Sequence, residues 1–336
     1  MDKNNKKKIV LHIGRHKSGT TSIQQFLHTN PEWLGRFGYY YPTIGKRAYA
    51  HHELGERFSR QSLRSAGPEY LLKNDEYAKS LIAEIDATDK SIIISSEAFQ
   101  NCDPSVIKKL FDKYDVRIVI YLRNQVSYLP SAYAQKIHAT DYAGTMEQFY
   151  QDIFDIDYHR FLSNWERQFP GKLTVRIFDR NTLIANDVVM DFLQSVLDID
   201  TSDNTIPVTG QDANPTLTSR LLAYKLYINT TYGDSLNQAF RRDLYRELGA
   251  LSRTDDSARV LPSAALAEQV IRDSEESNRL TAREYFDRSD LFNNDSLSFG
   301  EAYQITRQEI DKISGLLINQ APGLQALFQE PAKLRS

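Results

Sequence analysis

The sequence is poor in cysteine and contains no long apolar run. Cys102 is the single cysteine among 336 residues, so no disulfide can form within the chain, which favours a reducing compartment. No segment approaches the roughly 20 apolar residues that cross a bilayer. The basic start, MDKNNKKKIVLHIG, lacks the longer apolar segment and the small-residue cleavage site of a signal peptide. We therefore expect a cytoplasmic protein without a membrane span.

The net charge of the chain is also small. Its 41 Lys and Arg residues nearly balance 44 Asp and Glu residues, and the formal net charge of −3 gives no sign of general nucleic-acid binding. No cluster of cysteine and histidine has the spacing of metal ligands, and we expect no metal. Any anion site must therefore be local. With 41% hydrophobic and 25% charged residues, the composition is typical of globular proteins.

Short, nearly continuous apolar runs predict strands that are buried on both faces of a parallel sheet. There are four of them: KIVLHI (8–13), SIIIS (91–95), RIVIYL (117–122) and LTVRIF (173–178). Helical patterns separate these runs, and the one at 104–114 has a clear start in Asp103 and Pro104. The alternation predicts an α/β fold, with a P-loop-like parallel sheet flanked by helices and ligands at the carboxyl ends of the strands.

The later part of the chain has a different pattern. From about residue 186 it is mostly helical, and the segment 198–215 is rich in the residues of linkers and turns. We expect one domain over residues 1–336, with an α/β core at 7–200 and a mostly helical portion at 201–336.

The segment IGRHKSGTTSI, residues 13 to 23, is a variant of a nucleotide-phosphate loop. Gly14 and Gly19 keep the glycine spacing of G-x-x-x-x-G-K-[ST], but Thr20 follows the second glycine and the lysine is Lys17. A strand, a glycine-bracketed turn and a helix direct several backbone N–H groups at one anion. The first helical turn adds three hydroxyl donors: Thr20, Thr21 and Ser22.

The ends of the second and third predicted strands add a carboxylate and an arginine. Glu97 stands where a Mg²⁺-dependent kinase usually has an aspartate, so the strand end and the displaced lysine together weaken an ATP–Mg²⁺ interpretation. Arg123 leaves the third strand, and Ser131 follows eight positions later. An arginine and a hydroxyl that converge would suit a second phosphate, bound without a metal.

These motifs together resemble one known family. Residues 17–21, KSGTT, look like the 5′-phosphosulfate loop of sulfotransferases, and Arg123 and Ser131 fall at the spacing of their 3′-phosphate motif, R-N-x(6)-S-x-Y. The resemblance extends over roughly residues 7 to 200. The family's R-K-G loop does not occur here, and the C-terminal part is similar instead to a bacterial, carbohydrate-sulfotransferase-like group.

The resemblance implies the donor 3′-phosphoadenosine 5′-phosphosulfate, which needs no metal. Lys17 would then lie beside the bridging oxygen that gains charge as the sulfuryl group leaves. Thr20 and Thr21 would hold the 5′-phosphate, Arg123 and Ser131 the 3′-phosphate, and Phe178 would lie near the adenine. The remaining donor-site residues expected from the loop are these: Arg15, His16, Ser18, Gly19 and Ser22.

Glu97 is the expected catalytic base. Cytosolic members of the family have a histidine in the sequence K-T-H, where this chain has Ser-Ser-Glu. Some carbohydrate and protein-tyrosine sulfotransferases use a glutamate instead. An isolated glutamate has a pKa of about 4.3, but in a concerted transfer the proton need move only as the acceptor oxygen attacks.

An aromatic and basic stretch, GYYYPTIGKRAYA (38–50), leads to His51 and His52 and resembles a region of bacterial saccharide-modifying relatives. We expect Tyr41, His51 and His52 to bind a hydroxyl-bearing acceptor, most simply a glycan. Two alternatives stay open, namely a small-molecule P-loop kinase that uses Mg-ATP and a non-catalytic nucleotide-binding protein of the same fold. The sequence does not determine the oligomeric state.

Overall fold

The computed structural model describes residues 6–15, 17–155, 157–202, 206–207, 216–233 and 236–326. His16 and most of the predicted linker, namely residues 203–205 and 208–215, lie outside the described residues.

A parallel five-stranded sheet confirms the predicted fold class. Its strand order is β2-β3-β1-β4-β5, and every neighbouring pair is parallel. The strands are β1 (Lys8–His12), β2 (Tyr39–Tyr40), β3 (Ser91–Ser95), β4 (Asp115–Leu122) and β5 (Leu173–Ile177). Each of the four predicted runs forms a strand. The edge strand β2 was not predicted, because two residues are too short to leave an apolar run.

Both faces of the central strands are buried, as their continuous apolar sequence predicts. In the registered pair of β1 and β3, Ile9 lies beside Ile92 and Val10 beside Ile93, and all four side chains are at most 6% exposed. On the face that carries Val10, the sheet packs against helices α1 (Thr20–Thr29), α2 (Pro31–Arg36) and α11 (Val188–Ser195). This packing fixes the direction in which α1 leaves the end of β1.

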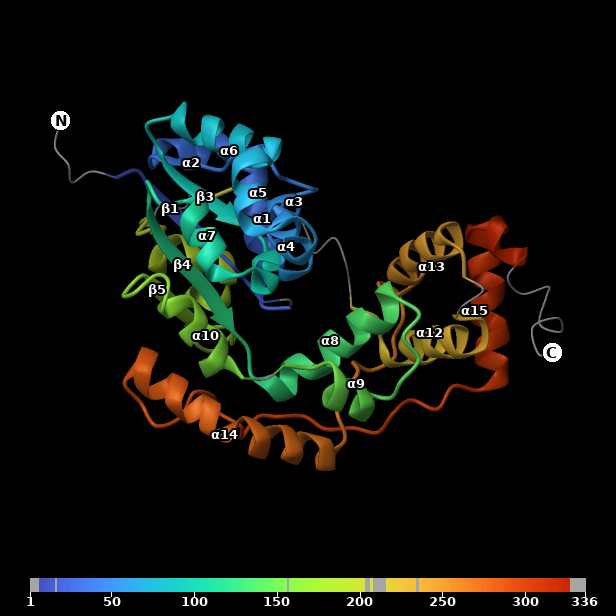
Figure 1. The fold of residues 1–336 in the computed structure, drawn as a ribbon. Helices are drawn as coiled ribbons and strands as arrows, with labels where there is room; N and C mark the ends of the chain where they lie inside the picture. Colours follow the sequence, from blue (N-terminus) through green and yellow to red (C-terminus); the bar gives the residue numbers. More distant parts are fainter. Residues whose placement is uncertain are drawn as a thin grey trace. The chain divides into compact units, whose positions relative to one another are not determined.

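Most of the other helices that lie between the strands along the sequence are short. They are α3 (His52–Arg57), α4 (Arg60–Ala66), α5 (Pro68–Asn74), α6 (Glu76–Asp86), α7 (Pro104–Leu110) and α10 (Tyr158–Glu166), with 3₁₀ turns η1 (Glu97–Asn101) and η2 (Ile184–Asn186) (Figure 1). Asp103 caps α7 as predicted, because its carboxylate accepts from the Ser105 amide at 2.9 Å. The helix ends at Leu110, four residues before the predicted end.

The described residues fall into two compact units that interleave along the chain. Unit 1 takes its described residues from 6–123, 157–207 and 277–291, and it contains the sheet. Unit 2 takes its described residues from 124–155, 216–276 and 292–326. Each unit therefore uses segments from both sides of residue 200, and the expected single domain with a division near that residue stays a prediction.

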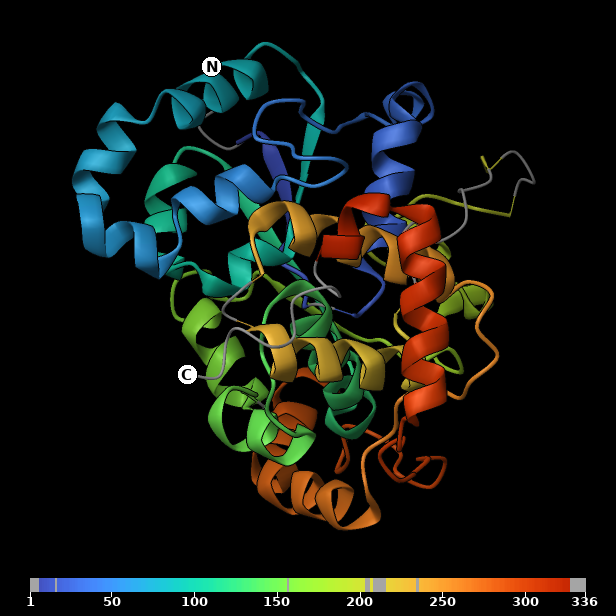
Figure 2. The ribbon, with the colours of Figure 1, turned by 90° about the vertical axis from the view of Figure 1, so that its right-hand side faces the viewer.

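Unit 2 is helical, in agreement with the pattern of the later sequence. Its helices are α8 (Gln125–Ala139), α9 (Met146–Asp152), α12 (Ser219–Tyr232), α13 (Gln238–Leu251), α15 (Arg307–Gln320) and the turn η4 (Pro322–Leu324), and α14 (Ala264–Phe286) has residues in both units. Figure 2 shows α15 in red beside α12 and α13, and the three share one apolar core with α8 and α9.

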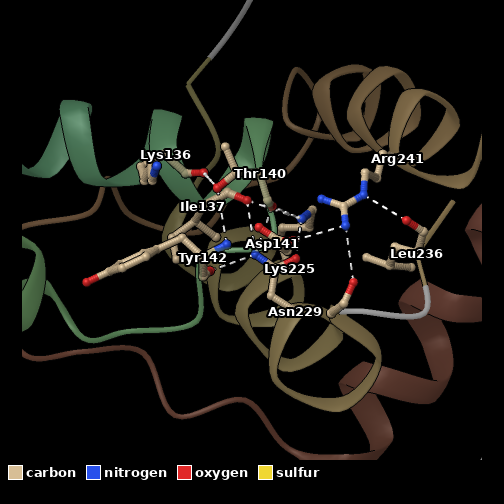
Figure 3. A network of polar contacts seen from close by, with 10 residues as sticks. Lys136, Ile137, Thr140, Asp141, Tyr142, Lys225, Asn229, Leu236 and Arg241 are labelled. Carbon is tan, nitrogen blue, oxygen red and sulfur yellow. Dashed lines mark hydrogen bonds and ion pairs between the residues drawn. The ribbon is translucent and has the colours of Figure 1, made fainter. Parts of the chain in front are cut away.

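A buried lysine and an asparagine close the C-terminal end of α8 (Figure 3). Lys225 is 2% exposed, and its Nζ donates to the carbonyls of Ile137 and Thr140 at 3.1 and 2.9 Å. Asn229 donates to the same two carbonyls and to that of Tyr142 at 2.8 Å. The last carbonyls of a helix lack partners within it, so these two side chains complete α8. Burial lowers the pKa of Lys225 to about 8.

Candidate functional site

The loop between β1 and α1 has the backbone geometry of an anion site. Lys17 and Gly19 both adopt left-handed conformations, with φ of 63° and 76°. Gly19 is the N-cap residue of α1 and supplies no side-chain hydrogen bond to the amides of the first turn. A left-handed lysine costs roughly 1–2 kcal/mol relative to ordinary backbone, which marks the loop as specialised. Amides at a helix start without a side-chain cap are suited to bind an anion.

The two glycines of this loop are required by close packing. A Cβ on Gly14 would lie 2.5 Å from Cγ2 of Thr20, and a Cβ on Gly19 would lie 2.7 Å from the ring of Phe178 and 2.9 Å from Val188. All three distances are shorter than van der Waals contact. The glycine spacing in the sequence therefore reflects how closely the loop lies on α1, on the end of β5 and on α11.

The other predicted loop residues divide into buried and accessible groups. Ser18 is fully buried, and its Oγ donates to the Arg15 carbonyl at 2.6 Å, so it braces the loop. Arg15 is 7% exposed, and its guanidinium lies 5.2 and 5.3 Å from the rings of Tyr158 and Phe161. In the first turn of α1, Thr20 is buried, Thr21 is exposed and Ser22 is half-buried.

The ends of β4 and β5 meet this same loop. Arg123, which follows β4, donates from Nη1 to the Lys17 carbonyl at 2.9 Å, and its guanidinium lies 5.9 Å from the ring centre of Phe178. The Phe178 amide donates to the Leu122 carbonyl at 2.7 Å, which fixes the phenylalanine at the strand end. Three strand ends thus bring a lysine, an arginine and an aromatic ring together. Ser131 lies half-buried on α8, in unit 2, and its place in a phosphate site stays a prediction.

Glu97 follows β3 and begins the turn η1. Its carboxylate oxygen Oε2 accepts from Nε2 of Gln24 at 2.8 Å, so a residue of α1 holds the predicted base. Sequence reasoning missed Gln24, since the partners are 73 positions apart and a polar residue in an amphipathic helix gives no signal of its own.

His12 lies beneath the loop and is fully buried. Its Nδ1 is 2.8 Å from Oγ of Ser95, and among the described residues its Nε2 has no hydrogen-bond partner. Burial lowers the pKa of His12 to about 4, against the opposing charge of Glu97. The ring is therefore neutral at pH 7.

Tyr41 and His51 have partners within the protein. The Tyr41 hydroxyl donates to the Tyr49 carbonyl at 2.7 Å, and its pKa is raised by burial and by Glu97. His51 accepts from the Ser95 amide at Nδ1 and donates from Nε2 to the Pro42 carbonyl. Contact of either residue with an acceptor stays a prediction.

His52 is half-buried, and its Nδ1 lies 2.9 Å from Oγ of Ser96, the residue before Glu97. This contact places the His52 ring beside the end of β3. Contact of His52 with an acceptor stays a prediction.

A lysine outside the predicted set lies over this region. Lys46 Nζ is 5.0 Å from the ring centre of Tyr41 and 3.3 Å from Nδ1 of His28, whose ring in turn lies 5.3 Å from that of Tyr49. Burial lowers the pKa of Lys46. The basic and aromatic stretch at 38–50 contained the signal for this cluster.

Within the described ranges, no helix is long and apolar enough to cross a membrane. In the same part of the chain, no group of three or more His, Cys, Asp or Glu side chains is arranged to hold a metal ion.

Comparison with known proteins gives limited matches. No model of a protein family matches the chain. The chain is 33% identical over 211 residues to an uncharacterized protein of Archaeoglobus fulgidus, a match that covers 60% of this chain and 55% of the relative. The chain thus spans little more than half the length of that relative.

Solved structures similar to this fold include the crystal structure of a sulfotransferase from Alicyclobacillus acidocaldarius, with 19% identity and a TM-score of 0.41 over 77% of this chain and 98% of the other. A likeness at this level carries no argument about function, which has to come from the residues of the site.

Proposed function

We propose that this protein is a sulfotransferase that moves the sulfuryl group of 3′-phosphoadenosine 5′-phosphosulfate to a hydroxyl, without a metal. The observation that carries the proposal is the meeting of three strand ends. The Arg123 guanidinium donates a hydrogen bond to the Lys17 carbonyl and lies over the ring of Phe178. That ring in turn packs against Gly19. This grouping is what a nucleotide with phosphates on two sides of its ribose requires: an anion loop, a second cation and a ring surface for the base.

The residues of unit 1 fit the parts of this donor. The amides at the start of α1, with Thr20, Thr21 and Ser22, would hold the 5′-phosphosulfate. Arg123 would pair with the 3′-phosphate and Phe178 would contact the adenine. Arg15 and Ser18 would hold the loop in shape. On the sequence resemblance alone, we also propose that His16 contacts the nucleotide from the loop. On the same ground, we propose that the Ser131 hydroxyl gives the 3′-phosphate a second hydrogen bond, beside that of Arg123.

The reaction would use Lys17 and Glu97 at opposite ends of the breaking and forming bonds. The acceptor oxygen attacks sulfur and gives its proton to the Glu97 carboxylate. The bond between sulfur and the bridging oxygen breaks, and 3′-phosphoadenosine 5′-phosphate leaves. Lys17 would stabilise the charge that grows on that oxygen, which exists mainly in the transition state.

We propose a carbohydrate acceptor, bound near Glu97 by Tyr41, His51 and His52. The support is the polar and aromatic cluster beside the carboxylate, where Tyr41 couples electrostatically to Glu97 and His52 approaches Ser96. Aromatic faces and hydrogen-bonding rims suit sugars. A cytoplasmic location is part of the same proposal and comes from the sequence.

Ligand-induced stabilisation tests the proposal against the kinase alternative. A ligand that binds only the folded state at 100 times its dissociation constant adds about 2.7 kcal/mol to stability. We expect 3′-phosphoadenosine 5′-phosphate to raise the melting temperature without Mg²⁺, and Mg-ATP to have little effect. Stabilisation by Mg-ATP alone would overturn the proposal.

A substitution of the base then separates an enzyme from a non-catalytic binding protein. Glu97→Gln should lower transfer of labelled sulfate to a glycan panel by about 10² to 10⁴-fold, because it removes the proton acceptor. Nucleotide affinity should stay within about twofold. Glu69→Gln, which changes an exposed carboxylate paired with Lys109, is the matched control. Parent protein that binds the nucleotide but transfers nothing would favour the non-catalytic alternative.

A further inference from the structure

A chain of four polar side chains runs from the protein interior to the proposed base. Nε2 of Gln24 lies 2.8 Å from Oε2 of Glu97 and 3.3 Å from Oγ of Ser95, and Ser95 Oγ lies 2.8 Å from Nδ1 of His12. His12 and Ser95 are fully buried, and Gln24 is 3% exposed. A buried chain of this kind is costly unless each hydrogen bond has a definite direction.

The direction of the two bonds from Gln24 follows from the chemistry of its amide. An amide NH₂ only donates, so both Glu97 and Ser95 accept from Gln24. The Ser95 hydroxyl therefore directs its own proton away from Gln24, and its further hydrogen-bond partners are Nδ1 of His12, at 2.8 Å, and the Tyr41 hydroxyl. The direction of the bond between Ser95 and His12 depends on which ring nitrogen of the neutral His12 carries the proton.

Neighbouring contacts fix the end of β3 in the same position. The Ser95 amide donates to Nδ1 of His51 at 3.2 Å, and the amide of Ser96 donates to the His12 carbonyl at 3.1 Å. A Cβ on Gly14 would lie 3.5 Å from Nε2 of His12, so the Nε2 side of the His12 ring lies directly under the anion loop. The hydrogen-bonded side chains thus extend from beneath the anion loop to the Glu97 carboxylate.

We propose that Gln24 is the positioning residue for Glu97, and that Ser95, itself bonded to His12, holds the amide of Gln24 in place by accepting from it. This inference rests on the proposed function for the role of Glu97 as base, but the hydrogen-bond chain itself does not. A donor to the charged carboxylate favours its ionised form and holds it in one orientation. The titratable groups coupled to this carboxylate include His12 and Tyr41, from β1 and from the segment after β2.

The test is a titration of Glu97 that needs no turnover. Protein labelled with ¹³C at glutamate side-chain carboxyls would be titrated by NMR, with the Glu97 signal assigned through Glu97→Gln. Gln24→Met removes the donor, so we expect the titration midpoint of Glu97 to rise by about one pH unit. Gln25→Met, on the adjacent and half-buried residue, is the matched control and should leave the midpoint unchanged. An unchanged midpoint in Gln24→Met overturns the inference.

A second variant covers the case in which Gln24→Met does not fold. Gln24→Glu keeps the shape but places a second carboxylate beside Glu97, so the pair should titrate in two separated steps. Two ordinary glutamate titrations would contradict the contact.

Kinetics then separates this inference from the proposed function. Gln24→Met should lower kcat by about tenfold or more while the affinity for 3′-phosphoadenosine 5′-phosphate stays unchanged. A raised midpoint in a protein without sulfotransferase activity would keep the contact and reject the function. Activity with an unmoved midpoint would do the reverse.

Discussion

The two units use their buried polar side chains differently. In unit 1, several of these groups bond other side chains, as in the hydrogen-bond chain from His12 to Glu97 and in the pairing of Tyr121 and Arg176 with the fully buried Asp191. In unit 2, five buried polar side chains bond backbone carbonyls. Lys225 and Asn229 complete the end of α8, His138 bonds the carbonyl of Tyr245, Ser252 that of Thr216, and Ser274 those of Val270 and Ile271.

This difference indicates separate roles for the buried polar side chains of the two units. A side chain that completes a helix end stabilises the fold and has no further group to act on. In unit 1, by contrast, the hydrogen-bond chain ends at the half-buried carboxylate of Glu97, which we propose it positions. Under the proposed function, the reacting groups Lys17 and Glu97 belong to unit 1, whereas Lys225 and Asn229 of unit 2 complete a helix end.

The largest expected effect compares one lysine from each unit. Lys17→Met should lower sulfate transfer by about 10³-fold, because the leaving oxygen loses its cation. Lys225→Met should leave transfer per folded molecule within about twofold, since its ammonium is used only by backbone carbonyls and Asn229. Steady-state kinetics on both variants measures this. A loss of activity in Lys225→Met comparable to that in Lys17→Met would remove the distinction between the units.

A somewhat smaller effect is the response of unit 1 to acid. Burial lowers the pKa of His12 to about 4 and that of His51 to about 3, from the ordinary 6.5. The unfolded chain binds protons first as pH falls, so stability is full above pH 6.5 and is lost towards pH 4. His12 alone accounts for a loss on the order of 3 kcal/mol over that window.

Unit 1 can be followed separately in this experiment. Both tryptophans, Trp33 and Trp165, belong to unit 1 and are buried, so urea unfolding by fluorescence reports on that unit. His12→Asn should reduce the slope of stability against pH near pH 5 by about 1.4 kcal/mol per pH unit. Lys225→Met should not, because the lowered pKa of Lys225 acts only between about 8 and 10.5. Equal slopes in parent and His12→Asn would show that His12 takes up a proton in the folded state.

Much of the fold could be predicted from sequence, for reasons that also explain what was missed. Strands buried on both faces leave continuous apolar runs, and β1, β3, β4 and β5 were found this way. Glu97 and Arg123 were found because parallel strands end at one edge of a sheet, where polar residues stand out. Helices α3 to α6 were not predicted, since their short, mixed sequences between residues 52 and 86 have no long amphipathic period.

Contacts across long separations could not be predicted. The partners Gln24 and Ser95 are 71 positions apart, and only the order of the strands brings them together. His138, on α8, is 8% exposed and stacks on Tyr245, with ring centres 4.1 Å apart. The spacing of residues along one helix does not show which of its faces a later helix will cover.

A third effect concerns a glycine of unit 1. Gly19→Ala should destabilise the protein by about 2–4 kcal/mol, since its φ of 76° disfavours a side chain and the added Cβ would meet Phe178 and Val188. Gly171→Ala is the matched control, with a φ of 67° but nothing within 4 Å, and should cost only about 1 kcal/mol. Fluorescence-detected unfolding compares the two. Equal losses would mean that backbone strain alone requires Gly19, and the close approach of Phe178 to the loop would be wrong.

The smallest effect has the opposite sign and lies in unit 2. Gly315 is exposed in the middle of α15, and a Cβ there would meet nothing within 4 Å. Alanine costs less backbone entropy than glycine in a helix, so Gly315→Ala should raise stability by about 0.5–1 kcal/mol. Circular dichroism follows this change, because it reports the helices of unit 2 where tryptophan fluorescence does not. A loss of stability would show that this face of α15 is occupied in solution. Unit 2 would then have a binding surface, which its buried polar side chains do not reveal because they bond backbone carbonyls.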